Sequence, residues 1–232
     1  DNTDAVSRLA IQDGYSYGYP QCTYTAHVSA CPNHQTLRMT PLESRFAVAS
    51  FGVLGYELNL NDMKTEDIAS VKAQIDLYKQ YRKTLQFGDF YRHRADNLYQ
   101  WSIVDKDKNT SVSMLMQREI VAGDQYLKLD LAGLEPETRY HFFGRKLEYN
   151  VKGFGDLVNT VSPIHIKQDS LVHNIVAKFV KMPGETEDYV AYGDALNSNG
   201  VKLVQSFVGT GFNEEVRYFP DFGARLYFVE KC

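Results

Sequence analysis

The chain has 232 residues, and its 25 Lys and Arg against 29 Asp and Glu give a formal net charge of −4 at pH 7. A mildly acidic chain without a basic block is a poor candidate for nucleic-acid binding, and no apolar run approaches the roughly 18–20 residues that cross a bilayer. Apolar residues make up 44% and charged residues 23%, which excludes wholesale disorder.

The first 88 residues carry mainly helical signals. Apolar side chains recur at three- and four-residue steps, and acidic residues or proline stand where helices begin. One short apolar run between two of the helices is typical of a buried strand. The elements predicted here are a helix over 4–18, a strand over 23–28, a polar loop over 29–40, and helices over 41–51 and 65–87.

The helix over 65–87 has the clearest pattern. Ile68, Val71 and Ile75 fall on one stripe, so this helix can bury one face against a larger body. Thr65 is expected to cap its amino end, and Gly88 is expected to end it.

After Gly88 the apolar period changes to two, which is typical of strands. Several short strands at this spacing predict an antiparallel sandwich. We therefore expect an α/β unit over 1–88 followed by an all-β domain over 89–232. Strands are predicted over 90–92, 99–104, 111–117, 126–131, 139–143 and 225–229, with a long insertion containing some strand over 147–192.

Three cysteines, Cys22, Cys31 and Cys232, do not make a disulfide framework. A sparse, odd count fits a reducing compartment, so we expect a cytoplasmic protein. No spacing of ligands predicts a metal site, and no motif predicts a cofactor. The sequence starts at Asp1 without Met, so we expect a fragment, a cleavage product or a truncated chain.

Chemistry-bearing residues gather in the first 34 positions. Asp1 and Asp4 stand at a helix start, where carboxylates cap and complement the helix dipole. A catalytic role would need a second carboxylate across a cleft, as glycoside hydrolysis does. Ser29 or Cys31 could act as a nucleophile with a histidine as base, but no nucleophile elbow surrounds either. Four tyrosines at 15, 17, 19 and 24 could stack on a sugar or pack in a core.

Several segments, in order along the chain, resemble family 36 glycoside hydrolases, the bacterial-type α-galactosidases. The similarity is specific because some of these segments are long. They are Asp1-Asn2-Thr3-Asp4-Ala5, Ala26-His27-Val28-Ser29-Ala30-Cys31-Pro32-Asn33-His34-Gln35-Thr36, Thr40-Pro41-Leu42-Glu43-Ser44-Arg45, Gly52-Val53-Leu54-Gly55-Tyr56-Glu57-Leu58, Gln86-Phe87-Gly88-Asp89-Phe90-Tyr91-Arg92 and Asp221-Phe222-Gly223-Ala224-Arg225-Leu226-Tyr227.

The resemblance implies that residues 1–88 are the end of a (β/α)8 barrel and that 89–232 form a carboxy-terminal antiparallel β-sandwich domain. It places the acid/base of a retaining double displacement at Asp1, with Asp4 as second choice and the nucleophile upstream of this chain. It makes the strand over 23–28 the eighth barrel strand. Leu37 departs from the family, which often has Gly there, and Tyr24-Thr25 stands where the family often has Met-Gly, which leaves the fine substrate preference open.

The resemblance therefore implies an α-galactosidase that releases terminal α-linked galactose from raffinose- or melibiose-like sugars. The alternative is a non-catalytic β-sandwich module, structural or carbohydrate-binding and inactive in isolation. No cofactor, metal, nucleic acid or membrane partner is expected. A homo-oligomer is expected. If the rest of the barrel is missing, the helices predicted within residues 1–88 would expose an apolar face, which a second chain would cover.

Overall fold

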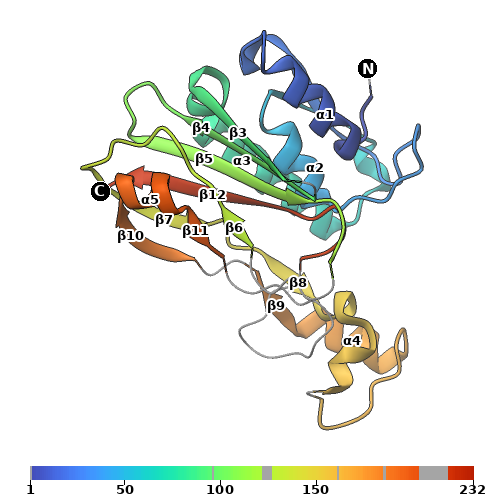
Figure 1. The fold of residues 1–232 in the computed structure, drawn as a ribbon. Coiled ribbons are helices and arrows are strands. Elements are labelled where there is room, and N and C mark those ends of the chain that lie inside the picture. The colour runs from blue at the N-terminus through green and yellow to red at the C-terminus, as the bar shows by residue number, and fades with distance from the viewer. Residues whose placement is uncertain (1, 96, 122–126, 161, 185–186, 204–218) are drawn as a thin grey trace.

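The computed structural model describes residues 2–95, 97–121, 127–160, 162–184, 187–203 and 219–232. Its helices lie on both sides of a central sheet (Figure 1). They are α1 (Ala5–Tyr15), α2 (Leu42–Ala49), α3 (Thr65–Phe87), α4 (Leu171–Phe179) and α5 (Gly193–Asn199), with short 3-10 turns at Gln21–Thr23, Leu60–Asp62 and Val151–Thr160.

Strands β1 (Thr25–Ser29) and β2 (Val53–Glu57) pair in parallel, with α2 as the crossover between them. His27 lies opposite Gly55, and a side chain at Gly55 would overlap the His27 ring, so the close approach requires glycine. A second parallel strand follows β1 in this chain. The expectation that the strand over 23–28 is the eighth, and so the final, barrel strand is therefore wrong.

The main sheet has six strands in the order β10-β7-β12-β5-β4-β3, all paired antiparallel. This confirms the antiparallel character predicted after Gly88. Residue 126 of the strand predicted over 126–131 lies outside the described residues, and within 127–131 the strand is two residues long and pairs with a second short strand. The strands are β3 (Asp89–Ala95), β4 (Leu98–Val104), β5 (Thr110–Gln117), β6 (Lys128–Leu129), β7 (Arg139–Gly144), β8 (Glu148–Asn150), β9 (Lys181–Pro183), β10 (Asp188–Tyr192), β11 (Val201–Lys202) and β12 (Ala224–Lys231).

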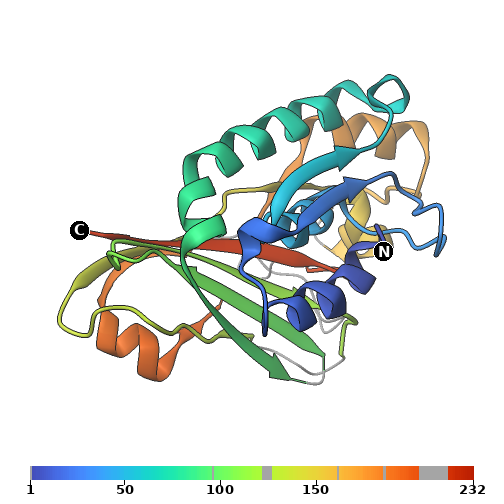
Figure 2. The same cartoon turned by 90° about the horizontal axis from the view of Figure 1, so that it is seen from above.

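Helix α3 has the predicted bounds, and its residues Val71, Tyr78 and Leu85 are buried on one face. Seen from above, α3 runs beside β2 and leads into β3 (Figure 2). Thr65 does not cap it: Lys64 holds the cap position without a side-chain bond, and Thr65 is the first helical residue. Gly88 holds the C-cap position, as predicted, and a side chain there would overlap Ile103 and the Val104 carbonyl.

Helix α2 joins the parallel pair to the main sheet. The backbone N–H of Ala224, at the start of β12, donates to Ser44 Oγ at 2.9 Å. Arg145, just after β7, pairs with Glu43 and lies over the Phe46 ring at 5.0 Å. A single buried cluster holds side chains from α1, β1, α2 and α3 together with side chains from β4, β5 and β12. One core therefore spans the residues before and after Gly88.

The segment over 147–192 contains a helix, α4, in addition to strands β8, β9 and β10. The prediction of an insertion with only some strand missed this helix. Ser170 caps α4 by accepting from the His173 N–H at 3.2 Å. Figure 1 shows α4 with β8 and β9 projecting away from the main sheet. In the described part of the chain, no helix is long and apolar enough to cross a membrane.

Candidate active site

The residues that follow β1 gather around the segment that precedes α1. Parallel strands end at the same edge of a sheet, which is where barrel enzymes place their chemistry. Ser29, the last residue of β1, donates from Oγ to the Thr3 carbonyl at 2.9 Å. Asn33 donates from Nδ2 to Thr3 Oγ1 at 3.0 Å and to Ser29 Oγ at 3.3 Å. Thr3 is thus held by two side chains from the neighbouring strand end.

Asp4 is the buried carboxylate of this region, and its side chain is 0% exposed. Its Oδ2 accepts from the Ser7 N–H at 3.1 Å and from Ser7 Oγ at 3.0 Å, which is the capping geometry that the sequence predicts. The same oxygen also contacts Arg38 Nη1 as an ion pair. Asp4 Oδ1 is buried and has no hydrogen-bond partner among the described residues.

The loop after β1 is held rigidly by polar contacts. Asn33 Oδ1 accepts from the N–H groups of Gln35 and Thr36 at 3.0 and 3.1 Å, so the side chain forms a turn with its own backbone. Arg45 in α2 donates to the Ser29 carbonyl and, from Nε at 3.1 Å, to the Thr40 carbonyl. Burial lowers the pKa of Arg45 from its ordinary value. One guanidinium therefore joins the two ends of the loop.

Arg38 extends from this loop to the main sheet. Its guanidinium carbon lies 5.3 Å from the ring centre of Phe222, just before β12. Beside this contact is a hollow of about 620 Å³ between two loops, formed by Cys31 and 39–41 on one side and Ile120 and 220–222 on the other. The loops after β5 and before β12 therefore reach the carboxyl end of β1.

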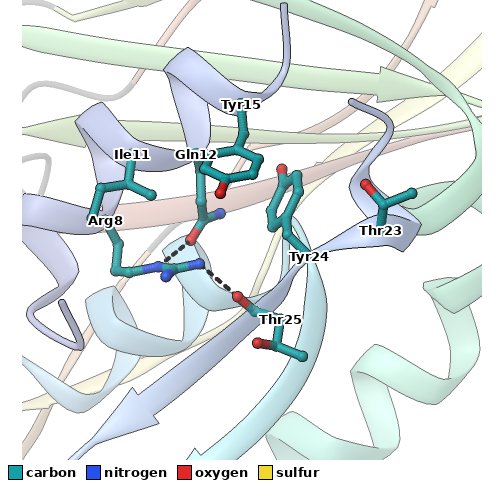
Figure 3. Close-up of a pocket in the computed structure, with 7 residues that line it drawn as sticks. All are labelled: Arg8, Ile11, Gln12, Tyr15, Thr23, Tyr24 and Thr25. Carbon is teal, nitrogen blue, oxygen red and sulfur yellow. Dashed lines mark hydrogen bonds between the residues drawn. The ribbon is translucent and has the colours of Figure 1, made fainter. Parts of the chain in front are cut away.

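A second cavity, of about 590 Å³, lies between the later turns of α1 and the amino end of β1 (Figure 3). Arg8 crosses it, donating from Nε to Gln12 Oε1 at 3.2 Å and from Nη2 to the Thr25 carbonyl at 2.6 Å. Tyr15 lies 5.7 Å from Tyr24 between ring centres. Two of the tyrosines considered for sugar stacking, Tyr15 and Tyr24, thus meet at the end of β1 opposite to the Thr3 and Asp4 contacts.

Burial raises the pKa of the Tyr24 and Tyr56 phenols above the usual value of about 10. Tyr24 Oη donates to the Phe51 carbonyl and Tyr56 Oη to Gln74 Oε1, each at 2.9 Å.

We therefore expect alkaline pH to destabilise this region. The unfolded phenols ionise near pH 10 while the folded ones stay neutral, so stability is intact below about pH 10 and falls as the pH rises toward the folded pKa. Tyr24→Phe with Tyr56→Phe is expected to flatten this decline, as followed by thermal melting between pH 8 and 11. Tyr17→Phe, at an exposed ring, is the control, and a decline as steep in the double variant would contradict the prediction.

Asp1, the predicted acid/base, lies outside the described residues, so its assignment stays a prediction. The alternative nucleophiles are not paired with histidine in the described structure. Ser29 Oγ is bonded to Thr3 and Asn33, and His27 Nδ1 lies 3.6 Å from Glu57 Oε2. Within the described ranges, no three His, Cys, Asp or Glu side chains gather as metal ligands would.

Sequence reasoning missed the links made by Asn33, Arg45 and Phe222. Pro32-Asn33 is a turn signal that could have indicated the bonds from the Asn33 side chain to its own loop. No local signal indicates the contact between Arg38 and Phe222, which lie far apart in the sequence.

Comparison with protein families gives two matches that together cover most of the chain. Residues 1–88 match the melibiase model, and residues 98–229 match the carboxy-terminal domain of glycosyl hydrolase family 36. The chain belongs to glycoside hydrolase family 36. This confirms the family that the sequence motifs indicate.

Curated relatives of this family 36 chain include two α-galactosidases from Lactobacillus acidophilus and Pediococcus pentosaceus. The chain is 45% identical over 142 residues to one from Lactobacillus acidophilus, covering 60% of this chain and 19% of the relative. It is 42% identical over 149 residues to one from Pediococcus pentosaceus, covering 63% of this chain and 20% of that relative. The aligned region therefore spans about a fifth of these relatives.

Solved family 36 structures match the whole chain. The α-galactosidase of Lactobacillus brevis superposes with a TM-score of 0.72 at 30% identity, covering 100% of this chain and 25% of that one. An α-galactosidase of Geobacillus stearothermophilus in complex with raffinose gives 0.71 at 27% identity, with the same coverage. This chain therefore spans a quarter of these solved chains.

Proposed function

We propose that this chain is part of a retaining α-galactosidase that releases terminal α-linked galactose from raffinose- or melibiose-like sugars. The observation that carries the proposal is the structural likeness of the whole chain to α-galactosidases, one of which was solved with raffinose. The segment from Asn2 to Asp4, held against the carboxyl end of β1, supports it, because barrel enzymes carry catalytic groups at strand carboxyl ends.

The proposed architecture is the end of a (β/α)8 barrel over 1–88 and an antiparallel β-sandwich domain over 89–232. The parallel pair of β1 and β2 with its crossover helix supports the first part, and the six-stranded antiparallel sheet supports the second. The protein is proposed to be cytoplasmic, because Cys22, Cys31 and Cys232 are all free thiols.

The proposed mechanism uses Asp1 as general acid and then general base. An upstream carboxylate would attack the anomeric carbon and form a β-linked covalent intermediate while Asp1 protonates the leaving oxygen. Asp1 would then take a proton from water, which attacks the intermediate and releases galactose with the α configuration retained.

The test is hydrolysis of raffinose and melibiose by the full-length protein, with the first-formed anomer followed by proton NMR. Release of α-galactose ahead of the β anomer is the expected result. Inversion, or sugar binding without hydrolysis, would contradict the proposal, and the second outcome would favour the alternative of a non-catalytic carbohydrate-binding module.

A homo-oligomer is also part of the proposal. Helix α4 exposes Leu171, Ile175 and Phe179 by 76%, 48% and 82%, and these residues share one face at four-residue steps. Light scattering of the full-length protein is expected to give a multiple of its chain mass. Phe179→Ser is expected to lower that mass, whereas Lys178→Ser is not; a wild-type monomer would contradict the expectation.

A further inference from the structure

Arg38 is held between two groups from different parts of the fold. On one side its Nη1 meets the fully buried carboxylate of Asp4, and on the other its guanidinium carbon lies 5.3 Å from the centre of the Phe222 ring. A guanidinium prefers both partners, since it pairs with carboxylates and stacks on aromatic faces. Phe222 therefore limits the positions from which Arg38 can reach Asp4.

The backbone is strained on both sides of this contact. Leu37, next to Arg38, has φ 57°, and Phe222 has φ 55°. Both values lie in the left-handed region, which bulky side chains rarely adopt and which persists only where the surroundings enforce it. Only four non-glycine residues of the described chain have positive φ, and two of them flank this one contact.

The loop that carries Phe222 is fixed to the main sheet. The Phe222 N–H donates to the Arg118 carbonyl at 2.9 Å, and Asp221 Oδ1 accepts from the Ile120 N–H at 2.7 Å. The Gly223 N–H donates to the Pro220 carbonyl at 2.9 Å. Three hydrogen bonds therefore hold the loop that presents the ring to Arg38.

We propose that Phe222 is a positioning residue for the general acid of the proposed α-galactosidase. It holds Arg38 against Asp4, and Asp4 with Thr3 fixes the segment that directly follows Asp1. A residue next to β12 thereby acts, through Arg38 and Asp4, on the segment that leads into α1. This inference rests on the proposed function.

Loss of the Phe222 ring is expected to slow the step in which the leaving oxygen is protonated. A general acid works only within hydrogen-bond reach of the leaving oxygen, and a displacement of about 1 Å can cost about 10²-fold in rate. Galactosides with a poor leaving group, such as raffinose, depend on that proton. The phenol of an activated aryl galactoside departs with little protonation, so the first step of that substrate is insensitive to the same displacement.

The test compares two substrates in the full-length enzyme. Phe222→Leu keeps apolar volume but removes the ring. It is expected to lower kcat/KM for raffinose by about 10-fold or more and kcat/KM for dinitrophenyl α-galactoside by less than about 3-fold, because kcat/KM reports the first step alone and leaves out the general-base step that both substrates share. Phe222→Tyr, which keeps the ring, is expected to retain the wild-type ratio of the two values. A purely structural role would lower both substrates equally.

Two further variants complete the test. Arg38→Lys keeps the charge but loses the flat guanidinium, so it is expected to shift the ratio in the same direction as Phe222→Leu. Tyr99→Leu is the matched control. It removes a ring whose centre lies 4.8 Å from the guanidinium carbon of Arg94, in the same sheet, and it is expected to leave the ratio unchanged. If the wild-type enzyme is active and the ratio is unchanged in both Phe222→Leu and Arg38→Lys, the inference about Phe222 is overturned and the proposed function stands. A wild-type protein without hydrolysis would overturn the proposed function and the inference with it.

Discussion

Asp1→Asn is expected to lower raffinose hydrolysis by the full-length enzyme by about 10²–10⁴-fold, the usual contribution of a general acid. Asparagine keeps the shape of the side chain but has no proton to donate to the leaving oxygen. An activated aryl galactoside needs less protonation of its leaving group, so its first step should fall much less. Asp76→Asn, at an exposed position on α3, is the control for loss of one negative charge.

The anomeric configuration of the galactosyl azide formed when azide is added identifies which carboxylate a variant has lost. With the nucleophile intact, the covalent intermediate is β-linked, and azide attacks it from the α face without needing a general base. Asp1→Asn is therefore expected to give the α-galactosyl azide and to recover the second step of the aryl substrate. The β-azide, or raffinose hydrolysis at the wild-type rate, would remove Asp1 from the role and move the test to Asp4.

Asp4 was predictable as a cap but not as a buried ion pair. Its position at a helix start and its carboxylate are enough to predict the bond to the Ser7 N–H. The approach of Arg38 depends on the loop after β1 and on Phe222, which comes from the last strand region. Contacts of this kind are set by tertiary packing, so no window of the sequence contains them.

The fold was predictable where apolar residues recur along one face of a long helix. Helix Thr65–Phe87 has over six turns of consistent periodicity, and its bounds were predicted correctly. Strand Val53–Glu57 was missed, because it is short, only half-buried and contains Gly55, which is unfavourable in strands. That glycine is needed to admit His27 from β1, a reason that appears only when the two strands are paired.

Helix Leu171–Phe179 was missed for a different reason. Its Val172, Ile175 and Val176 are β-branched and are typical of strands, and the surrounding Pro163 and Pro183 break the pattern. The cap at Ser170 was the one local signal for a helix. Its apolar side remains exposed in the described structure, so burial within this chain does not explain the pattern.

The core shared across Gly88 predicts that the two parts of the chain lose protection together. Trp101 in β4 is 1% exposed, and its ring centre lies 5.6 Å from that of Phe51, which follows α2, and 5.7 Å from that of Phe90 in β3. Its Nε1 donates to Asp13 Oδ1 in α1 at 3.3 Å. One side chain thus contacts α1, the turn after α2 and β3, on both sides of the predicted boundary.

Trp101→Ala is expected to lower the free energy of local opening by about 3–5 kcal/mol, the usual cost of removing a large buried aromatic side chain. Hydrogen exchange in the full-length protein would measure this separately in peptides from α1 and α2 and in peptides from β4 and β5. Both sets are expected to lose protection, because the same ring fills the space between them. Tyr17→Phe, at a ring that is 74% exposed and that keeps its contact with Arg92, is the control and is expected to change protection by less than about 0.5 kcal/mol. Loss confined to β4 and β5 would mean that the units before and after Gly88 open independently, in spite of the core that they share.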